Sequence, residues 1–445
     1  MPGPFRQQHQ HRISLQKSEG PTILKQRLEN TPVPSKQPVF RGWWIAAAAA
    51  VTYGIAQGIP YYNVSFFYDY FQRSFGWSRA EITLGFPLAA LLTFWVGPVI
   101  IPRFSQRKLI LFGTCSTALA LAGFAFMQGS LAVYFALWAL YTIGYLASGP
   151  IPHQLIISQW FSKRRGTAMG IVYLGVGVVG SLGSVIVKNV TASHGFRNAL
   201  LVLAACMFAG WPLVLFVLRD RPSDCGLAID GGDASLVPAS QPAWSTQALV
   251  RSRAFWLLLL SSVCSIGSVG AISQHMKFIF LDAGFRLGPE LDSTWRTASV
   301  VVLCSSTVGR LLVGILADLL STRLVMIASY LLTALTVVPL LTLHAPHPPY
   351  VFAVLFGIAM GADYMLIPLM VAEEFGLGTL ARAMGLILPI NTIAQTWFPY
   401  FIALLRDRSS SYRLPLLTVT VVAALGVIAM LALPRRRADS SQATA

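Results

Sequence analysis

The sequence predicts an all-α membrane protein in which twelve transmembrane helices form two repeated halves of six. Three observations predict this class: low charge, apolar runs of membrane-spanning length, and an internal repeat. Of the 445 residues, 55% are hydrophobic and 11% are charged, whereas soluble domains carry about 25% charged residues. Apolar runs of about twenty residues are long enough to cross the ~30 Å hydrocarbon core as helices. The sequence lacks the alternating strands of a membrane barrel, so the spans are expected to be helical.

The apolar runs define the expected spans in chain order. Several connections between them are short, as at Gln128–Ser130, and short connections place successive helices antiparallel. The second span is expected to begin at a capping box, in which Ser78 and Glu81 satisfy each other's backbone groups. The twelve expected spans are residues 43–67, 80–101, 108–128, 131–157, 167–187, 198–218, 255–281, 295–317, 323–343, 350–371, 383–404 and 412–433.

Polar segments divide these spans into regions. The N-terminal segment is rich in Gln, Pro and basic residues, and it lacks the apolar stretch of a cleaved signal peptide. A second polar segment separates the spans six and six. We therefore expect a cytoplasmic N-terminal tail at 1–42, a six-helix half at 43–218, a cytoplasmic linker at 219–252, a second half at 253–433 and a cytoplasmic tail at 434–445.

The net charge of +16 is distributed as in a membrane protein. With the N-terminus inside, 22 Lys and Arg residues fall on the cytoplasmic side and nine fall outside. Cytoplasmic loops of membrane proteins carry such an excess. We therefore expect a multi-pass protein of the plasma or inner membrane with both termini in the cytoplasm. No basic helix is present to follow a phosphate backbone, which argues against nucleic acid as a partner.

The cysteines and the candidate chemistry argue against an enzyme. The five cysteines are scattered, and four of them lie in apolar runs. This indicates neither a disulfide framework nor a metal site. An embedded enzyme would show a clustered metal or nucleophile constellation. We expect no cofactor, no metal and no enzymatic activity.

A shift of about 215 residues maps one half of the chain onto the other. Each matched pair falls on equivalent spans, which is unlikely by chance. Two six-helix halves repeated in parallel are typical of transporters, with the site near the midplane between the halves. A channel would more often show a filter loop or a symmetric oligomer. The pairs are Tyr134 with Tyr350, Pro152 with Pro368, Ala168–Gly170 with Ala383–Gly385, and Phe196-Arg197 with Tyr412-Arg413.

Four segments carry a resemblance to a known family. They are the entry to the second span at Phe75–Glu81, the basic motif Trp160–Gly170 before the fifth, the motif Gly309–Asp318 in the eighth, and the linker start Arg221–Leu227. From residue 41 to 433 the chain resembles the monocarboxylate-porter and oxalate/formate-antiporter branch of the major facilitator superfamily. The resemblance implies the major facilitator fold and secondary transport of a small organic anion.

The resemblance also implies gating contacts between the halves at the cytoplasmic ends. The residues that would make them are Arg103, the basic run Lys163, Arg164 and Arg165, and Asp318. One departure concerns the first of these. Pro102 precedes Arg103 where the superfamily's loop motif usually has Asp, so the N-terminal half lacks the expected carboxylate.

Arg310 and Asp363 are the principal charged candidates within the membrane. Arg310 lies about eight residues before the cytoplasmic end of its span, or ~12 Å deep. A charge at such depth is costly and must face a partner or a wet cavity. A guanidinium binds a carboxylate with two hydrogen bonds, and the resemblance gives Arg310 the position of the porters' substrate-binding arginine. Asp363 must be either paired or protonated, which suits a proton carrier; a static ion pair with Arg310 is the alternative.

The N-terminal half offers polar groups without fixed charge. Tyr61, Tyr62 and Asn63 follow Pro60 in the first span, where a freed backbone carbonyl could line a cavity. We expect these three residues to contact substrate. His153 in the fourth span is a second candidate for the coupling proton, because histidine titrates near physiological pH. A bonded packing histidine is the alternative for His153.

Asn391 and Gln395 lie one turn apart in the eleventh span and are also expected to bind substrate. Departures from the family narrow the chemistry. Animal monocarboxylate porters carry a lysine where Tyr61 aligns and an acid where Ser306 aligns. Oxalate carriers place a lysine in the eleventh span, and this span has none, which lowers the case for a dicarboxylate.

The predicted function is secondary transport of a small monocarboxylate such as lactate or pyruvate, coupled to a proton, by alternating access. Two alternatives remain open. One is an exchanger or efflux carrier of another organic anion, of the oxalate or formate type. The other is a membrane sensor that keeps the fold without translocating a solute.

Overall fold

The computed structural model describes residues 40–231, 243–286, 289–345, 347 and 349–434. The chain divides into two compact units, Met1–Phe40 and Arg41–Ala445. Only Phe40 of the first unit is described. Most of the predicted tails, and residues 232–242 of the predicted linker, therefore lie outside the described residues.

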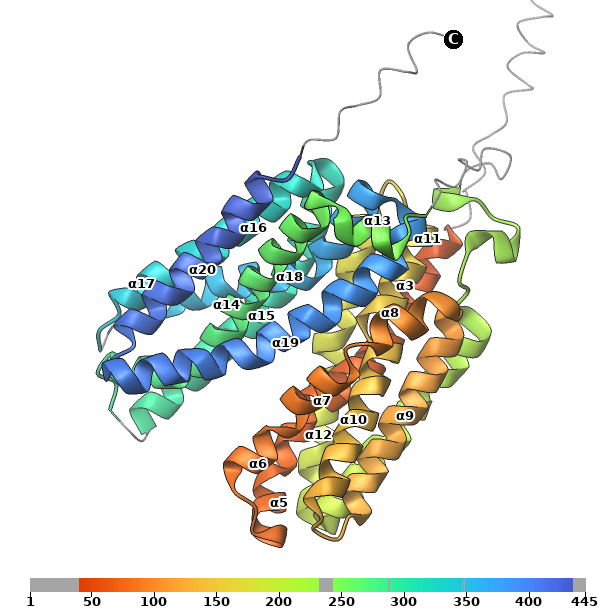
Figure 1. Cartoon of the computed structure of the whole chain (residues 1–445). Coiled ribbons are helices and arrows are strands. Elements are labelled where there is room, and N and C mark those ends of the chain that lie inside the picture. Colours follow the sequence, from red (N-terminus) through yellow and green to blue (C-terminus); the bar gives the residue numbers. More distant parts are fainter. Residues whose placement is uncertain (1–39, 232–242, 287–288, 346, 348, 435–445) are drawn as a thin grey trace, which may run out of the picture. The chain divides into compact units, whose positions relative to one another are not determined.

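All regular elements of the described residues are helices, which confirms the predicted class. The first half contains several interrupted helices and one very long helix, α12 (Figure 1). Its elements are α3 (Arg41–Tyr53), a π-helix (Gly54–Gly58), α4 (Ile59–Asn63), a 3-10 helix (Val64–Phe67), α5 (Tyr68–Phe75), α6 (Arg79–Thr83), α7 (Gly85–Thr93), α8 (Val96–Ile100), a 3-10 turn (Ile101–Arg103), α9 (Gln106–Phe126), α10 (Leu131–Ser148), α11 (Pro150–Trp160), α12 (Arg165–Cys206), a 3-10 helix (Met207–Gly210) and a π-helix (Leu213–Val217).

The second half is made of longer, less interrupted helices. Two 3-10 turns and the short α13 precede it in the part of the linker that the structure describes. The elements are the turns Pro222–Cys225 and Ile229–Gly231, α13 (Thr246–Arg251), α14 (Arg253–Asp282), α15 (Pro289–Leu319), α16 (Thr322–Leu335), α17 (Val337–Leu341), α18 (Tyr350–Phe375), α19 (Leu377–Ser409) and α20 (Arg413–Leu431).

The number of membrane crossings agrees with the sequence once broken helices are counted. Within the described residues, nine helices are long and apolar enough to span a membrane, and a bent pair, Glu81–Thr93 with Val96–Arg103, makes ten. The stretch Arg165–Val217 has 53 residues, or about 80 Å of helix, and it turns at Gly195, where φ is 81°. It therefore supplies two crossings. The interrupted stretch from α3 to α5 supplies the twelfth.

Several predicted spans differ from the helices observed, and in the first and the fourth a proline lies at the irregular segment. The first span was expected at 43–67 and extends from Arg41 to Phe75. It widens into the π-helix just before Pro60, which has no N–H for the regular ladder. The fourth span was expected as one helix at 131–157 and instead breaks between α10 and α11 at Gly149, with Pro150 first in α11. Proline is favoured at the first position of a helix, because its fixed φ is helical and because an N–H at that position would have no acceptor within the helix.

The predicted capping box at the second span is confirmed. The Ser78 backbone N–H and hydroxyl both donate to Glu81 Oε2, each at 2.8 Å, and the Glu81 N–H donates to Ser78 Oγ at 3.2 Å. These bonds satisfy donors that the first turn of a helix otherwise leaves without partners.

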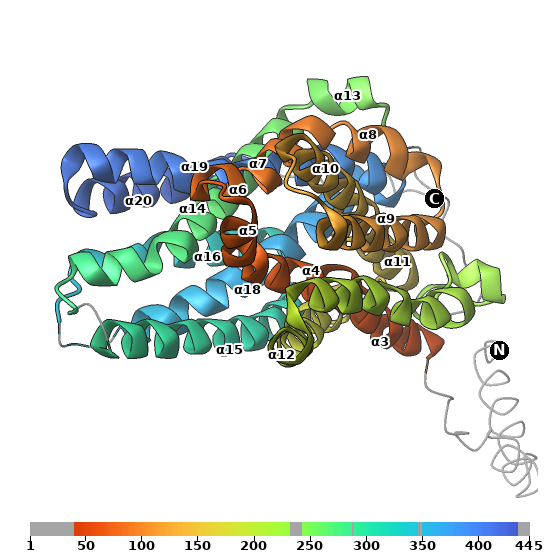
Figure 2. The ribbon, with the colours of Figure 1, turned by 90° about the horizontal axis from the view of Figure 1, so that it is seen from below.

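Glycine backbones allow the two halves to approach closely at two places. A Cβ on Gly166 of α12 would lie 2.3 Å from the Gly314 carbonyl oxygen of α15. A Cβ on Gly97 of α8 would lie 2.3 Å from the Gly385 carbonyl oxygen of α19. Small residues at helix contacts are the usual means of close packing in membranes. Figure 2 shows α12 beside α15 where these two long helices meet.

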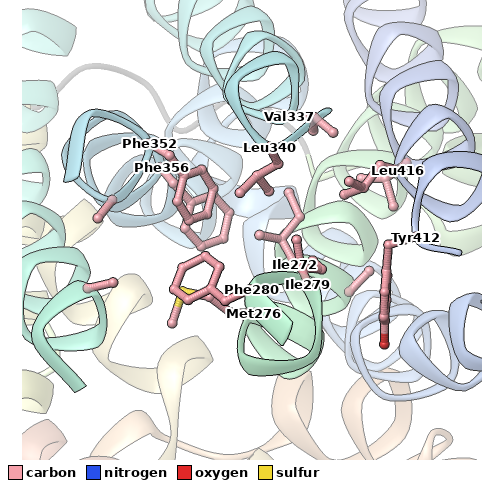
Figure 3. Close-up of a cluster of buried hydrophobic side chains, with 14 of the residues drawn as sticks. Ile272, Met276, Ile279, Phe280, Val337, Leu340, Phe352, Phe356, Tyr412 and Leu416 are labelled. Carbon is pink, nitrogen blue, oxygen red and sulfur yellow. The ribbon is translucent and has the colours of Figure 1, made fainter. Parts of the chain in front are cut away.

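A core of aromatic and aliphatic side chains holds the second half together toward the ends of its helices near α17 (Figure 3). Phe352 and Phe356 of α18 stack with ring centroids 5.3 Å apart, and Phe280 of α14 packs edge-on against Phe352. Val337 and Leu340 of α17 close the cluster. This packing ties α14, α17, α18 and α20 together in the second half.

Candidate functional site

Arg310 reaches from the second half into the first. Its guanidinium donates from one terminal nitrogen to the Tyr173 carbonyl oxygen of α12 at 3.1 Å. It also interacts with the Tyr53 and Tyr173 phenols. The side chain is 8% exposed. Among the described residues, no carboxylate lies within ion-pair distance of Arg310. A buried cation without a carboxylate partner is the feature that an anionic substrate would satisfy.

Five tyrosines form a connected group that includes Tyr53 and Tyr173, the two phenols that interact with Arg310. The tyrosine cluster consists of Tyr53 of α3, Tyr61 of α4, Tyr145 of α10, Tyr173 of α12 and Tyr364 of α18, whose phenols interact with one another. Membrane-embedded hydroxyls need partners, and these have them in both halves. Of these five tyrosines, only Tyr61 was predicted from the sequence to lie at the site.

Hydrogen bonds link the tyrosine cluster across the boundary between the halves. Gln154 Nε2 donates to the Tyr173 hydroxyl at 2.5 Å, and that hydroxyl donates to the Tyr364 carbonyl oxygen at 3.3 Å. The Tyr364 hydroxyl in turn donates to Gln395 Oε1 at 2.8 Å. The predicted substrate residue Gln395 therefore belongs to the network around Arg310.

Of the predicted substrate residues in the first half, Tyr61 belongs to the tyrosine cluster and Asn63 does not. Asn63 is buried and donates to the Ile59 carbonyl oxygen at 2.7 Å and to the Gly180 carbonyl oxygen at 3.4 Å, so it joins α4 to α12. Tyr61 is 41% exposed, and its phenol interacts with the tyrosine cluster. The Tyr62 side chain lies outside the described part of the structure.

Asn391 points into the second half rather than toward Arg310. It is fully buried, and its Oδ1 accepts a hydrogen bond from the Ser262 hydroxyl of α14 at 3.1 Å. Gln395 lies one turn further along α19 but bonds to Tyr364 instead. The one-turn spacing seen in the sequence therefore does not bring the two amides to the same site.

Asp363 does not pair with Arg310. The carboxyl is 2% exposed, and neither of its oxygens has a hydrogen-bond partner among the described residues. It interacts with Ser265 of α14 and with the Tyr330 phenol of α16. Asp363 therefore faces the interior of the second half, and the static ion pair considered from the sequence is not formed.

His153 is fully enclosed in the first half. Its Nδ1 lies 2.8 Å from the Gly149 carbonyl oxygen, and its Nε2 lies 3.0 Å from Thr52 Oγ1. Because a carbonyl can only accept, Nδ1 carries a hydrogen. The ring also packs against Tyr53, with centroids 5.0 Å apart. Both nitrogens are thus occupied, one of them at the break between α10 and α11.

Asp318 joins the halves at the predicted cytoplasmic ends. Its carboxylate accepts the Gly166 N–H at 2.6 Å, the Thr167 N–H at 2.8 Å and the Thr167 hydroxyl at 2.6 Å. A carboxylate at a helix N-terminus is stabilised by free N–H groups and by the helix dipole. Asp318 of α15 therefore caps α12 of the opposite half.

The basic run before α12 meets further carboxylates. Arg165 interacts with Glu373, Asp230 and Asp318, and its Nε donates to the Phe161 carbonyl oxygen at 2.9 Å. Asp230 of the linker accepts the backbone N–H of Lys163 at 2.8 Å. Arg164 and Arg103 are exposed.

Within the described residues, no three His, Cys, Asp or Glu side chains are grouped so as to hold a metal ion. The groups near the center of the molecule are one guanidinium, several phenols and amides. Such groups are able to bind a small anion by hydrogen bonds and charge.

Comparison with known proteins gives one family. The sequence matches the Major Facilitator Superfamily over residues 54–309 and 287–445. Monocarboxylate transporter 11 of Mus musculus is 25% identical over 431 residues, which cover 91% of this chain and 90% of the relative.

Two solved structures share the fold. The Major Facilitator Superfamily transporter FucP, in the outward conformation, superimposes with a TM-score of 0.63 at 12% identity, covering 88% of this chain and 99% of FucP. The proton:xylose symporter XylE, bound to 6-bromo-6-deoxy-D-glucose, gives a TM-score of 0.65 at 13% identity, covering 89% of this chain and 96% of XylE.

Proposed function

The chain belongs to the Major Facilitator Superfamily, and on that premise we propose that it carries a small monocarboxylate together with a proton across a cell membrane by alternating access. The predicted family and fold are confirmed. Members of this family are multi-pass membrane transporters rather than enzymes. The proposal goes further and concerns substrate, coupling and orientation.

The observation that carries the substrate class is Arg310. It is buried, it has no acidic partner among the described residues, and it extends across the boundary to the Tyr173 carbonyl. A carboxylate would take the guanidinium's remaining donors and accept hydrogen bonds from nearby phenols. One fixed cation favours a single carboxylate over a dicarboxylate. The mouse relative bears the name of a monocarboxylate transporter, which supports the same class.

Alternating access is supported by where the halves touch. Asp318 and the glycine contact between Gly166 and Gly314 lie at the ends that the positive-inside rule assigns to the cytoplasm. We infer that the cytoplasmic gate is closed in this structure and that both termini face the cytoplasm. Opening of this gate would expose Arg310, about 13 Å along α15 from Leu319, to the other side.

Counterflow in proteoliposomes tests the function. Purified protein preloaded with lactate, pyruvate, formate, oxalate or an amino acid should exchange a labelled monocarboxylate most rapidly. Fastest exchange of oxalate would replace the proposal with an organic-anion exchanger. No exchange of any solute in well-sealed vesicles would favour a sensor that does not transport.

Two variants test the role of Arg310. Arg310→Ala removes a charged hydrogen-bond donor, which costs about 2–3 kcal/mol, or roughly a 30- to 150-fold loss of apparent affinity. Arg310→Lys keeps the charge but loses the planar fork, so a large part of the loss should remain. Arg406→Lys is the matched control, because Arg406 pairs with Asp407 at an exposed position. Near-normal affinity in Arg310→Ala would remove this residue from the site.

A further inference from the structure

Asp363 interacts with two other buried polar side chains, Ser265 of α14 and Tyr330 of α16. Ser265 Oγ and the Tyr330 hydroxyl are each without a hydrogen-bond partner among the described residues, as are both Asp363 oxygens. Ser265 and Asp363 are 2% exposed and Tyr330 is 1% exposed. These three residues, the Asp363 cluster, come from α14, α16 and α18. Buried polar atoms are normally satisfied, so their convergence indicates a missing ligand.

Among the described residues, no cationic side chain pairs with the Asp363 carboxylate. The guanidinium on α15 is turned to α12, where it bonds to Tyr173. The remaining titratable groups facing the Asp363 cluster are weak acids without charge at neutral pH. On the described helices packed against α18, these weak acids are Cys264 of α14, Tyr330 of α16 and Tyr364 of α18 itself. The polar groups that α19 contributes, Asn391 and Gln395, are neutral amides. His153 of α11 is already bonded to Gly149 and Thr52.

We propose that the Asp363 cluster binds one monovalent cation, a proton or a sodium ion, at a site inside the second half and separate from Arg310. An unpaired carboxylate at this depth is strongly unfavourable, and a single positive charge neutralises it. A bound proton would let the carboxyl donate to one hydroxyl and accept from the other. A sodium ion would be held by the two carboxylate oxygens and the two hydroxyl oxygens, the hard ligands that such ions prefer.

The cation site and the substrate site share one helix contact. Gly361 of α18, two residues before Asp363, packs closely against α15. A Cβ on Gly361 would lie 2.4 Å from the Ser306 carbonyl oxygen and 3.1 Å from the backbone nitrogen of Arg310. A shift of α18 on cation binding therefore moves the backbone that carries Arg310. This step rests on the proposed transport function, whereas cation binding itself does not.

Thermal unfolding of the purified full-length protein tests the binding. Melting temperature would be followed by tryptophan fluorescence from about pH 5.5 to 8.5, with sodium chloride or choline chloride at equal ionic strength. A ligand that binds the folded state raises the melting temperature. A saturable rise with sodium alone identifies a sodium site; a rise as pH falls, equal in both salts, identifies a proton site.

Asp363→Asn should remove the response, because it makes the side chain neutral at every pH. Ser265→Ala and Tyr330→Phe should shift the midpoint of the response by about tenfold each, and Ser265→Thr should restore it. They also serve as the test if Asp363→Asn does not fold. Asp407→Asn, at an exposed carboxylate, is the control and should respond as the unaltered protein does.

The response of Arg310→Ala separates this proposal from the proposed function. That variant should lose monocarboxylate exchange and keep the cation-dependent change in melting temperature. An unaltered protein that responds to neither sodium nor pH would overturn the cation site. So would a response that survives in Asp363→Asn, or one unchanged in both hydroxyl variants.

Discussion

Replacing Asp318 with asparagine should open the gate that we propose at the cytoplasmic ends of α12 and α15. In the structure one carboxylate oxygen accepts the Gly166 N–H and the other accepts the Thr167 N–H and hydroxyl. Asparagine offers one oxygen in place of two, carries no charge, and turns an amide group toward N–H donors. A hydrogen bond to a charged group contributes about 1.5–3 kcal/mol, and neighbouring bonds are not additive. We expect the closed gate to lose about 3 kcal/mol of stabilisation relative to the open gate, which shifts the equilibrium roughly 150-fold toward the open gate.

Distances between spin labels on the two halves would measure that shift. Phe104 follows the 3-10 turn after α8, and Leu320 follows α15; both side chains are exposed and neither belongs to the gate. Cysteines introduced there in a cysteine-free background report the gate in lipid nanodiscs. The unaltered Asp318 protein should give mainly the short distance, and Asp318→Asn should populate a longer one.

Asp318→Glu and Asp407→Asn complete the design. Glutamate keeps the charge but is longer, so the closed population should be intermediate. Asp407→Asn removes an exposed carboxylate near the C-terminal end of α19 and should leave the distances unchanged. If Asp318→Asn gives the same distance distribution as the unaltered protein, the carboxylate does not stabilise the closed gate and the reasoning fails.

Three further predictions concern coupling and contact between the halves. If Asp363 carries the coupling proton, Asp363→Asn should keep substrate exchange and lose accumulation driven by an inward proton gradient. If His153 carries the proton, His153→Gln should lose that accumulation instead. Gradient-driven accumulation in both variants would exclude Asp363 and His153 as proton carriers. Gly166→Val would place side-chain atoms against the Gly314 carbonyl oxygen, 2.3 Å from the Cβ, and should lengthen the same spin-label distance; an unchanged distance would contradict this contact. Tyr173→Phe removes the hydroxyl that joins the halves. The loss of these hydrogen bonds costs about 1–3 kcal/mol and should slow substrate exchange by about 5- to 150-fold. Exchange at the unaltered rate would show that this hydroxyl is dispensable.

The spans could be predicted from the sequence because the length and polarity of a span depend only on consecutive residues. The capping box at Ser78 and Glu81 was predictable for the same reason, since both partners lie within one turn. The break at Gly149 was not predicted, because Gly149–Pro150 lies inside an apolar run whose average hydropathy hides it. The π-helix before Pro60 follows from proline chemistry, but its extent depends on packing against α12.

The direction of a side chain within a span was the main quantity that the sequence did not provide. Arg310 and Asp363 lie at neighbouring depths, so a pair was a reasonable alternative; a helix turns about 100° per residue, and Asp363 points to α14 and α16 instead. The sequence did not point to Tyr53, Tyr145, Tyr173 and Tyr364, because tyrosine was counted with the apolar residues. A hydroxyl that must find a partner in the membrane was the available signal.

The internal repeat pairs the Asp318 carboxylate with a cation in the first half. The shift of about 215 residues pairs Gly170 with Gly385, and both glycines contact the opposite half, Gly170 at the Arg310 carbonyl and Gly385 at the Gly97 carbonyl. The two contacts between halves are therefore counterparts. The same shift takes Asp318 to Arg103, an exposed cation, which cannot accept bonds from the N-terminus of α19. Because only one of the two contacts has a capping carboxylate, the closed gate depends on Asp318 more strongly than a symmetric gate would, and Asp318→Asn should open it without a second substitution.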